Sequence, residues 1–293
     1  MRVVTSLVLC LVSGFTFANA EKNLDANEIM SQVIDRYQGE SKVSQLSLIT
    51  CEYRIVNQRV KCESQRRKKV LRSFVKNYGE SLRDTKGYTH IDEPVSERGI
   101  SILQYDYEDT SKDTDQWLYL PELNKVKRIS SDGSAPKSAS LFGSEFSLED
   151  IERPKLSDYK FSLLEQKTIS GENYAIIQQV PVDSKAKSTS YSKQLLWVDL
   201  NKHIVRKTEY YAWDQKLIKV RQSAAIEDID GIWTVGKEVI RNLETQRISE
   251  LSHKNVVYNV KIDDNMLTQR MLVDPIFRES KLKGVTGSLA VSN

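Results

Sequence analysis

Short runs of β-branched and aromatic residues, separated by turn residues, recur along most of the chain. Such runs are typical of β-strands, and the short segments between them suit an antiparallel meander. No helical pattern alternates with the runs, which disfavours a doubly wound parallel sheet. The predicted strands span residues 46–56, 70–78, 88–91, 100–107, 116–120, 174–180, 194–200, 204–213, 217–223, 233–242 and 255–262.

This succession of strands predicts a mainly β fold of the α+β type, built on one large antiparallel sheet. A sheet of this size cannot stay flat, because the twist between neighbouring strands accumulates. We therefore expect a strongly curved sheet, an incomplete β-barrel, covered by a few helices and enclosing an apolar cavity. Residues 21–293 are expected to form a single domain, with a small, polar and mobile tail at 283–293.

The clearest helix is predicted after Asp25, an N-cap residue that is followed three positions later by the acidic Glu28. Gly39 is placed to end this helix. Apolar residues recur at helical spacing and give it one apolar face: Ile29, Met30, Val33, Ile34 and Tyr37.

Two shorter helical segments and two loops are predicted between the strands. A capping box at residues 147–150 starts a short helix that ends near Pro154, and residues 274–275 (Asp-Pro) open a helical turn. Residues 130–140 are rich in Ser, Gly and Pro, and residues 183–192 are rich in Ser, Lys and Thr, as in loops.

The first twenty residues have the three parts of a secretory signal peptide. Residues 1–2 are Met-Arg, residues 3–17 are mostly apolar, and residues 18–20 (Ala-Asn-Ala) form a small-x-small cleavage site. The apolar run, about 15 residues, is shorter than the about 20 that span a membrane, which favours cleavage after Ala20 over an uncleaved anchor. Cys10 follows a leucine, not a small residue, and is interpreted as part of the signal. A periplasmic location is therefore expected.

The charge of the chain is close to neutral, with a formal net charge of +3 and both signs interspersed. Nucleic-acid binding needs a strong basic excess or a basic face, so it is not expected. The one dense basic cluster, residues 66–69 (Arg-Arg-Lys-Lys), is interpreted either as the solvated part of a strand or as a contact for anionic lipid headgroups or an acidic partner.

Beyond the signal segment the chain has two cysteines, Cys51 and Cys62, and an even pair in an oxidising compartment usually forms a disulfide. A hairpin centred between Val56 and Asn57 would place the two cysteines directly opposite each other, within reach of the bond. Their spacing lacks the paired ligands of a zinc site.

The sequence contains no GxSxG, no HExxH, no glycine-rich phosphate loop and no Walker lysine motif. We therefore expect a protein without enzymatic activity; an envelope hydrolase would need a polar catalytic cluster in the cavity.

Three isolated histidines predict neither a metal site nor another cofactor: His90, His203 and His253. Four neighbouring carboxylates are interpreted as caps and solvated charges or as an acid/base pair: Glu145, Glu149, Asp150 and Glu152.

Several segments are rich in aromatic residues, which suit either ordinary core packing or the lining of a ligand cavity. Phe142 and Phe146 flank a Gly143-Ser144 turn. The other aromatic residues considered are Trp117, Tyr119, Trp197, Tyr210, Tyr211, Trp213 and Trp233.

Residues 115–129 read DQWLYLPELNKVKRI, and residues 141–150 read LFGSEFSLED. Together they resemble the signature of the LolA-like outer-membrane lipoprotein-sorting proteins, a D-x-W-x-Y-x-P segment with a basic V-x-R-I ending, then FGSDF and an E-D pair. Glu145 replaces the usual aspartate, and Leu148 stands where an aromatic residue is common. Residues 193–199, 202–211 and 216–220 resemble a strand pair of the same family.

The resemblance implies roles for residues of the two segments. Leu118 and Leu120 join the aromatic residues as expected cavity lining. Arg128 and the pair Glu149–Asp150 are expected to hold the two segments together, against the alternative of independent surface charges. The expected structural residues of the motif are Asp115, Pro121, Arg128, Gly143, Ser144, Glu149 and Asp150.

The resemblance also implies an incomplete barrel with a helical lid, which binds a lipid or the acyl chains of a lipoprotein and carries them between the inner and outer membranes. A monomer is expected, with an inner-membrane exporter of the RND type as a partner and a mobile loop at 130–140 for release. The alternative is a periplasmic sensor or adaptor that binds lipid and regulates a membrane partner. A carrier delivers its ligand to an acceptor membrane, whereas a sensor holds it.

Overall fold

The structure, a computed structural model, describes residues 25–129 and 138–290. The predicted signal peptide, residues 1–20, lies outside the described residues, and so does most of the loop predicted at 130–140. Within the described ranges, no helix is both long and apolar enough to cross a membrane.

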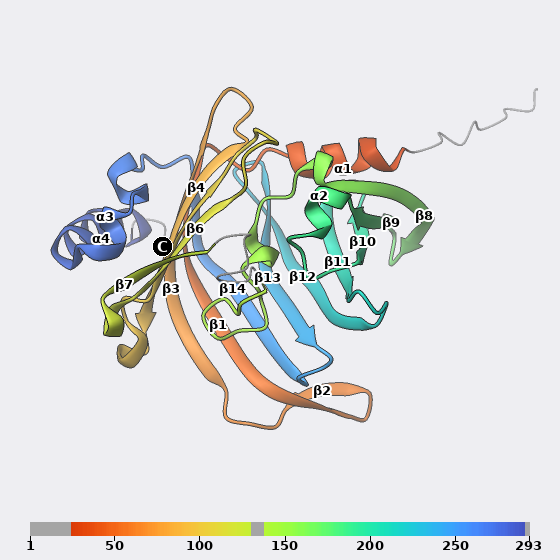
Figure 1. Cartoon of the computed structure of the whole chain (residues 1–293), viewed down its shortest axis with the longest axis horizontal. Coiled ribbons are helices and arrows are strands. Elements are labelled where there is room, and N and C mark those ends of the chain that lie inside the picture. Colours follow the sequence, from red (N-terminus) through yellow and green to blue (C-terminus); the bar gives the residue numbers. More distant parts are fainter. Residues whose placement is uncertain (1–24, 130–137, 291–293) are drawn as a thin grey trace, which may run out of the picture.

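In this part of the chain, fourteen strands form one antiparallel sheet that is strongly curved and does not close (Figure 1). The order of the strands is β7-β6-β5-β4-β3-β1-β14-β13-β12-β11-β10-β9-β8, and β2 pairs with β1 alone. The predicted fold class is therefore confirmed. The strands are β1 (Ser41–Val56), β2 (Arg59–Cys62), β3 (Arg67–Tyr78), β4 (Asp84–Glu93), β5 (Ser101–Asp106), β6 (Asp115–Leu120), β7 (Lys125–Ile129), β8 (Tyr159–Ile169), β9 (Glu172–Pro181), β10 (Lys193–Asp199), β11 (Ile204–Tyr211), β12 (Leu217–Ile229), β13 (Ile232–Asn242) and β14 (Arg247–Tyr258).

Several strands are longer than the sequence predicts, among them β1, β4 and β12, and other differences concern whole strands. The sequence pattern misses β7 and β8, and β8 is exposed along most of its length, so it lacks the buried face that marks a strand. The strand predicted at 255–262 lies at Arg247–Tyr258 instead. His253 and Tyr258 of this strand line an internal cavity, which hides the usual alternation of apolar and polar positions.

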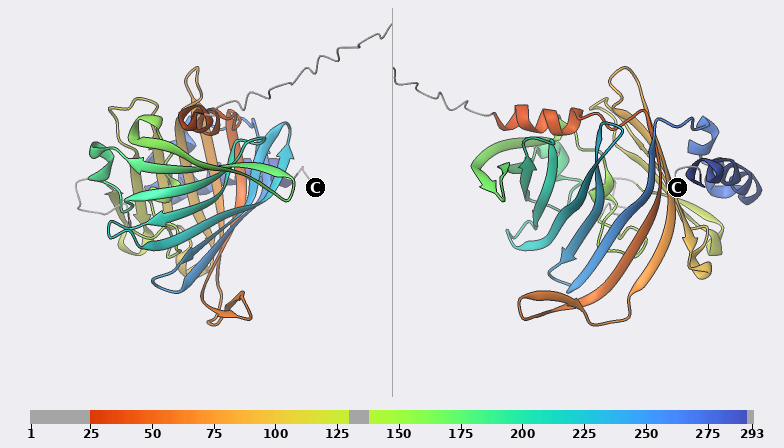
Figure 2. Two further views of the ribbon diagram at one scale, coloured as in Figure 1. Left: turned by 90° about the vertical axis from the view of Figure 1, so that its right-hand side faces the viewer. Right: turned by 180° about the vertical axis from the view of Figure 1, so that it is seen from behind.

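The two edges of the sheet are β7 and β8, which follow each other in the sequence. The connection between them therefore has to cross from one edge of the sheet to the other. Its described part, residues 138–158, passes over the concave face, where most of it lines the cavity. Figure 2 shows this open, curved shape from two further sides.

The first helix, α1 (Ala26–Asp35), lies along the rim of the sheet, over β8 to β11 (Figure 1). The predicted N-cap is present, because the Asp25 side chain accepts a hydrogen bond from the Asn27 amide at 3.1 Å. The helix ends before Tyr37, which is 51% exposed. Its apolar face packs on β9 and β10 in a cluster of Ala26, Ile29, Met30, Ala175, Ile177, Leu196 and Val198.

Gly39 does not end α1 but lies in the turn that leads into β1. Its φ of +78° belongs to the left-handed region that glycine favours, and a Cβ there would lie 2.9 Å from Cδ1 of Tyr258. The glycine is therefore required for the close approach of this turn to β14.

The C-terminal helices α3 (Arg270–Val273) and α4 (Pro275–Ala290) pack on the convex face of the sheet, opposite to the cavity (Figure 1). The predicted helical turn at 274–275 thus opens a longer helix, which continues through residues 283–290, where no element was expected. Residues 291–293 lie outside the described residues. The buried cluster on this face contains Val43, Phe74, Tyr88, Leu103, Tyr119, Ile262, Met266, Leu267, Met271, Leu272 and Leu282.

The remaining elements are short. A 3-10 turn at Glu149–Ile151 stands where the capping box predicts a helix, and the Ser147 amide donates to Asp150 Oδ2 at 2.7 Å, which is one half of that box. The others are α2 (Asp183–Ala186), η1 (Val95–Glu97), η2 (Pro121–Leu123), η4 (Leu156–Asp158) and η5 (Asp264–Leu267).

The predicted disulfide between Cys51 and Cys62 is present, with 5.7 Å between the two Cα atoms. The hairpin register differs from the prediction, because Cys62 pairs with Tyr53 and the turn is formed by Asn57 and Gln58, both with positive φ. The two cysteines are therefore diagonal neighbours across the hairpin. The bond ties the projecting end of β1–β2 back to the body of the sheet (Figure 1).

Opening the disulfide with a reductant should lower the free energy of unfolding by about 3 kcal/mol, the loop-closure value for a loop of about 11 residues. Urea unfolding of the oxidised and reduced protein measures the difference. Cys62→Ser should match the reduced protein, because Cys62 is exposed and its replacement leaves the core intact. Two free thiols in the oxidised, folded protein would contradict the pairing.

Candidate functional site

A cavity of about 600 Å³ lies on the concave face of the sheet. This volume falls within the range of about 300–1,000 Å³ that is usual for small-molecule sites. One wall of the cavity is apolar and combines strands β1, β3 and β5 with the connection that crosses the concave face: Leu46, Leu48, Leu71, Ile102, Phe142 and Phe146.

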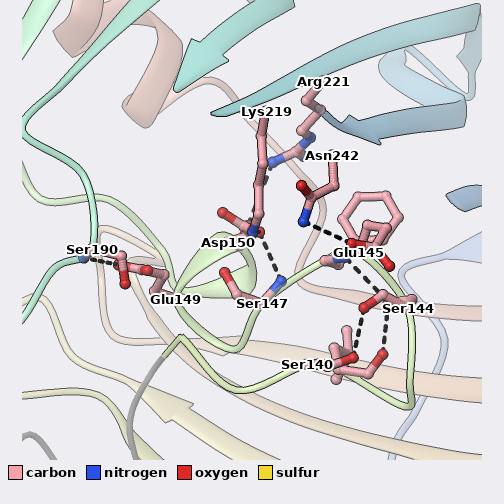
Figure 3. Close-up of polar contacts among 12 residues, drawn as sticks. Ser140, Ser144, Glu145, Ser147, Glu149, Asp150, Ser190, Lys219, Arg221 and Asn242 are labelled. Atoms are coloured by element: carbon pink, nitrogen blue, oxygen red, sulfur yellow. Dashed lines mark hydrogen bonds and ion pairs between the residues drawn. The ribbon is translucent and has the colours of Figure 1, made fainter. Parts of the chain in front are cut away.

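We call residues 138–154 of this connection the strap. Within the strap, residues 141–146 form a closed turn, because the Leu141 amide donates to the Phe146 carbonyl at 2.7 Å. The Ser144 hydroxyl donates to the Leu141 carbonyl, and the Ser140 hydroxyl donates to the Ser144 carbonyl, both at 2.6 Å (Figure 3). Gly143, with a φ of +73°, allows the reversal. The turn directs both phenylalanines into the apolar wall.

Glu145 anchors the middle of the strap to the opposite side of the cavity. Its side chain is nearly buried, and its carboxylate pairs with Arg247 Nε at 3.1 Å. Asn242 Nδ2 donates to the same carboxylate at 2.9 Å (Figure 3). The Glu145 amide donates to the Ser249 hydroxyl at 3.0 Å. On the other side, Lys69 Nζ donates to the Phe142 carbonyl at 2.6 Å. The strap is thus tied to β3, β13 and β14.

The acidic pair Glu149–Asp150 anchors the end of the strap. Tyr191 donates to Asp150 Oδ1 at 2.8 Å, and Lys219 Nζ lies 3.4 Å from Asp150 Oδ2. Glu149 Oε2 accepts from the Ser190 amide at 3.2 Å (Figure 3), whereas its Oε1 is buried without a hydrogen-bond partner. Burial raises the pKa of Glu149.

A group of polar and charged side chains lines the cavity from four adjacent strands. Arg221 Nε on β12 donates to Glu238 Oε1 on β13 at 2.9 Å, and this ion pair keeps the pKa of Glu238 low although burial opposes it. Next to them, burial lowers the pKa of His253 on β14 to about 4 and also lowers the pKa of Lys42 on β1. Arg36, directly after α1, lines the same cavity.

The structure separates the residues that the sequence suggested as cavity lining. Phe142, Phe146 and Trp233 line the cavity, as do Tyr210 and the motif residues Ser144, Glu149 and Asp150. Leu118 packs against the apolar cluster beneath the strap, and Leu120 is half-buried at the end of β6.

The prediction that Trp117 and Tyr119 line the cavity is wrong. Both pack in the cluster on the convex face, against the C-terminal helices, because alternate residues of β6 point to opposite faces and Leu118 takes the inner one. Trp197 is half-buried beside Lys207, with 4.0 Å from Nζ to the ring centre, and is not part of the cavity lining.

Tyr211 and Trp213 also lie outside the cavity lining. The Tyr211 hydroxyl donates to Glu209, and Trp213 is 54% exposed with its indole nitrogen 3.4 Å from the Thr189 carbonyl.

The expected contact between Arg128 and the acidic pair is also corrected. Arg128 NH2 lies 2.5 Å from Asp115 Oδ1, within the first motif segment. It stands opposite Trp117 in the sheet and shares its convex face, whereas Asp150 lies on the concave side. The charged groups that hold the strap come instead from β3, β12 and β14, with further hydrogen bonds from β5, β6, β13 and the segment before β10. Of the basic cluster at 66–69, the first three residues are exposed, and Lys69 holds the strap.

Sequence reasoning missed Lys219, which holds Asp150, and these charged or titratable residues of the cavity lining: Arg36, Lys42, Arg221, Glu238 and His253. The alternation along the strand was an available signal. Positions 42, 46 and 48 are separated by even numbers of residues, so the side chains of Lys42, Leu46 and Leu48 point to the same face of the sheet. This signal was overlooked because the strand was predicted to begin only at residue 46.

Comparison with known proteins adds the family and the fold. A family model described as "Uncharacterized protein"-like matches residues 83–274. No curated protein matches the sequence.

Three solved structures share the fold. A DUF1329 family protein from Desulfovibrio piger is 24% identical, with a TM-score of 0.74 over 84% of this chain and 97% of that chain. A putative outer membrane lipoprotein-sorting protein domain from Vibrio parahaemolyticus is 25% identical, with a TM-score of 0.72 over 85% and 98%. A LolA superfamily protein from Nitrosomonas europaea is 20% identical, with a TM-score of 0.62 over 84% and 98%. The chain therefore has the LolA-like fold, as the motif suggested.

Glu145→Ala should lower the free energy of unfolding by about 2 kcal/mol, because it leaves Arg247 and Asn242 without their carboxylate. Glu244→Ala is the matched control, since its ion pair with Lys216 is half exposed, and such pairs contribute about 0–1 kcal/mol. Urea unfolding of the two variants measures both values. Equal losses would mean that Glu145 is not an anchor of the strap.

The contribution of His253 to stability should fall as the pH drops from about 6.5 towards 4. The pKa of His253 is about 4 in the folded protein against a usual 6.5, so between these values the unfolded chain binds more protons. The stabilisation is complete above pH 6.5 and is lost as the pH falls through this window. His253→Gln should reduce the slope of stability against pH, and His90, whose pKa burial also lowers to about 4, should supply part of the remainder. An unchanged slope in His253→Gln would contradict the assignment.

Proposed function

We propose that this protein carries a lipid or the acyl chains of a lipoprotein through the periplasm. The chain belongs to the family whose model matches residues 83–274. Its curved sheet encloses a cavity with an apolar wall. The observation that carries the proposal is the wall formed by Leu46, Leu48, Leu71, Phe142 and Phe146. Each methylene group that such a wall removes from water contributes about 0.8 kcal/mol, so a chain of ordinary length binds without any covalent step.

The strap supports reversible loading of the cavity. Among the described residues it is held to the concave face by side-chain contacts instead of a continuous strand ladder, since its isolated β-bridge, Ser140 to Ser147, joins two residues of the strap itself. Polar contacts of this kind can be exchanged for water at modest cost, because water replaces the hydrogen bonds that are lost. Movement of the strap would therefore open the apolar wall while the sheet stays intact.

The proposed compartment and partner rest on the sequence. A signal-peptide pattern at 1–20 and the disulfide between Cys51 and Cys62 favour the periplasm. The resemblance of the motif to LolA-like proteins suggests an inner-membrane exporter of the RND type as a partner. The proposed carrier is a monomer without enzymatic activity. Two acidic residues of the strap, Glu145 and Asp150, serve as anchors instead of catalytic groups, because each is held by a basic residue.

A fluorescent fatty-acyl probe tests the proposal. The protein should bind it saturably, and total membrane lipid should displace it. Val235→Trp should weaken binding more than about tenfold, because the indole displaces at least two methylene groups of the chain from the cavity that Val235 lines. Val95→Trp is the control, since Val95 is 75% exposed and lies outside the cavity lining. Absence of saturable binding in the wild-type protein would overturn the proposal.

A transfer assay separates a carrier from a sensor. Protein loaded with the probe should deliver it to acceptor vesicles faster than the probe leaves donor vesicles alone. Binding without any transfer would identify a sensor or adaptor and would reject the carrier.

A further inference from the structure

Lys42 and Arg36 line the cavity without a carboxylate partner among the described residues, and so does Arg153, which is held instead by the carbonyls of Ile34, Leu82 and Arg83 and by the Thr85 hydroxyl. In residues 25–129 and 138–290, the Lys42 ammonium forms no ion pair and no hydrogen bond, although Lys42 lines the cavity. Arg36 NH1 donates to the Trp233 carbonyl at 2.5 Å, its Nε is buried without a partner, and no carboxylate of the same ranges pairs with the guanidinium. A charge that is removed from water without a partner is costly, so this arrangement favours an anion that the protein itself does not supply.

The surrounding groups do not compensate these charges. The carboxylate whose field acts on Lys42 is that of Glu238, and Glu238 is already bonded to Arg221 through two nitrogens. His253 lies on the neighbouring strand, opposite Leu46, and its low pKa keeps it neutral at pH 7. Arg36 adds a second positive charge that acts on Lys42. This end of the cavity is therefore positive.

The other carboxylates that line the cavity lie on the strap side and beside it, at Asp106, Glu149, Asp150, Glu152 and Asp158. Asp150 is held by Lys219 and Tyr191, and Glu152 pairs with Lys185 at 3.2 Å. Asp106 accepts from the Thr114 hydroxyl at 2.9 Å and from the Gln104 amide at 2.8 Å. The cavity therefore has an anchored acidic side next to the strap and a positive end between α1 and β1.

The positive end is continuous with the apolar wall. Lys42, Leu46 and Leu48 occupy alternate positions of β1 on one face, and all three line the cavity. A molecule with an anionic head at Lys42 would therefore run its chain along β1 towards Phe142 and Phe146 in the strap.

We propose that Lys42 and Arg36 form a headgroup subsite, so that the cavity takes an amphiphile with one acyl chain or more and an anionic head, a carboxylate or a phosphate ester. This inference rests on the proposed function and deepens it, since it names the charge of the ligand and its direction in the cavity. His253, whose Nδ1 is buried without a hydrogen-bond partner, supplies a neutral polar contact beside the head. Lys42 and Arg36 act as ligand-binding residues, and no covalent step is involved.

The charge requirement is tested with two ligands of the same chain, oleate and oleyl alcohol, each displacing the fluorescent fatty-acyl probe. The wild-type protein should bind oleate at least about tenfold more tightly than the alcohol, which corresponds to about 1.4 kcal/mol. Lys42→Met should lose most of this preference and Arg36→Met part of it, while the affinity for the alcohol stays within about twofold of wild type. Lys68→Met is the matched control, because Lys68 is an exposed lysine at the end of β3, and it should keep the preference.

The stability of the variants separates loss of binding from loss of folding. Lys42→Met removes an uncompensated charge from a partly apolar site, so its thermal midpoint without ligand should equal or exceed that of the wild type. A variant that is at least as stable but no longer prefers the anion would identify a binding residue, whereas a clearly lowered midpoint would make Lys42 a structural residue and overturn its assigned role.

The outcomes distinguish the two proposals. Binding of neither ligand by the wild type would remove the proposed function. Equal binding of oleate and the alcohol by the wild type, or a full preference in Lys42→Met, would leave the carrier intact and overturn the headgroup subsite. Inorganic phosphate is added as a competitor: displacement of oleate by millimolar phosphate alone would show a site for a free anion instead of a lipid head and would also overturn the inference.

Discussion

The structure depends on one topological constraint, which is that consecutive strands β7 and β8 form opposite edges of an open sheet. The chain has to cross the concave face to connect them, and a backbone that crosses there must satisfy its polar groups. The concave face supplies partners for this purpose. Gln116 Nε2 donates to the Leu148 carbonyl at 3.1 Å, Gln104 Nε2 donates to the Ile151 carbonyl at 3.0 Å, and Lys69 reaches the Phe142 carbonyl. The polar residues Gln104, Gln116 and Lys69 inside the curved sheet therefore serve the backbone of the strap.

The two faces of the sheet are covered unequally. On the convex face, α3, α4 and the 3-10 turn before them fill one half of the sheet with a closed apolar cluster that includes Tyr119 and Leu272. On the concave face, α1 and the strap cover two separate regions and leave about 600 Å³ between them. A narrow helix and an extended strap cannot fill a surface that curves away from both, so the cavity follows from the curvature and the few covering elements.

The cavity combines two environments that suit the two ends of an amphiphile. Its apolar wall offers burial, which is proportional to area and has little directional preference. Its positive end at Lys42 and Arg36 offers a charge that acts strongly because the surroundings have a low dielectric constant. The apolar wall therefore supplies affinity for chains in general, and the proposed subsite adds discrimination between heads. Burial in the same surroundings raises the pKa of Glu149 and lowers the pKa of His253.

The sequence by itself determined most of the strands, the N-cap of α1, the disulfide and the motif of the strap, because these depend on local patterns of at most a dozen residues. Only the tertiary structure decided which face of each strand is enclosed. On β6, Trp117 and Tyr119 have the alternation expected of cavity lining, but α3 and α4 cover that face. On β12, Lys219 and Arg221 have the alternation expected of a solvated face, but the strap brings Asp150 to both of them. A strand has two faces with the same period of two, and what covers each face comes from residues that lie far away in the sequence.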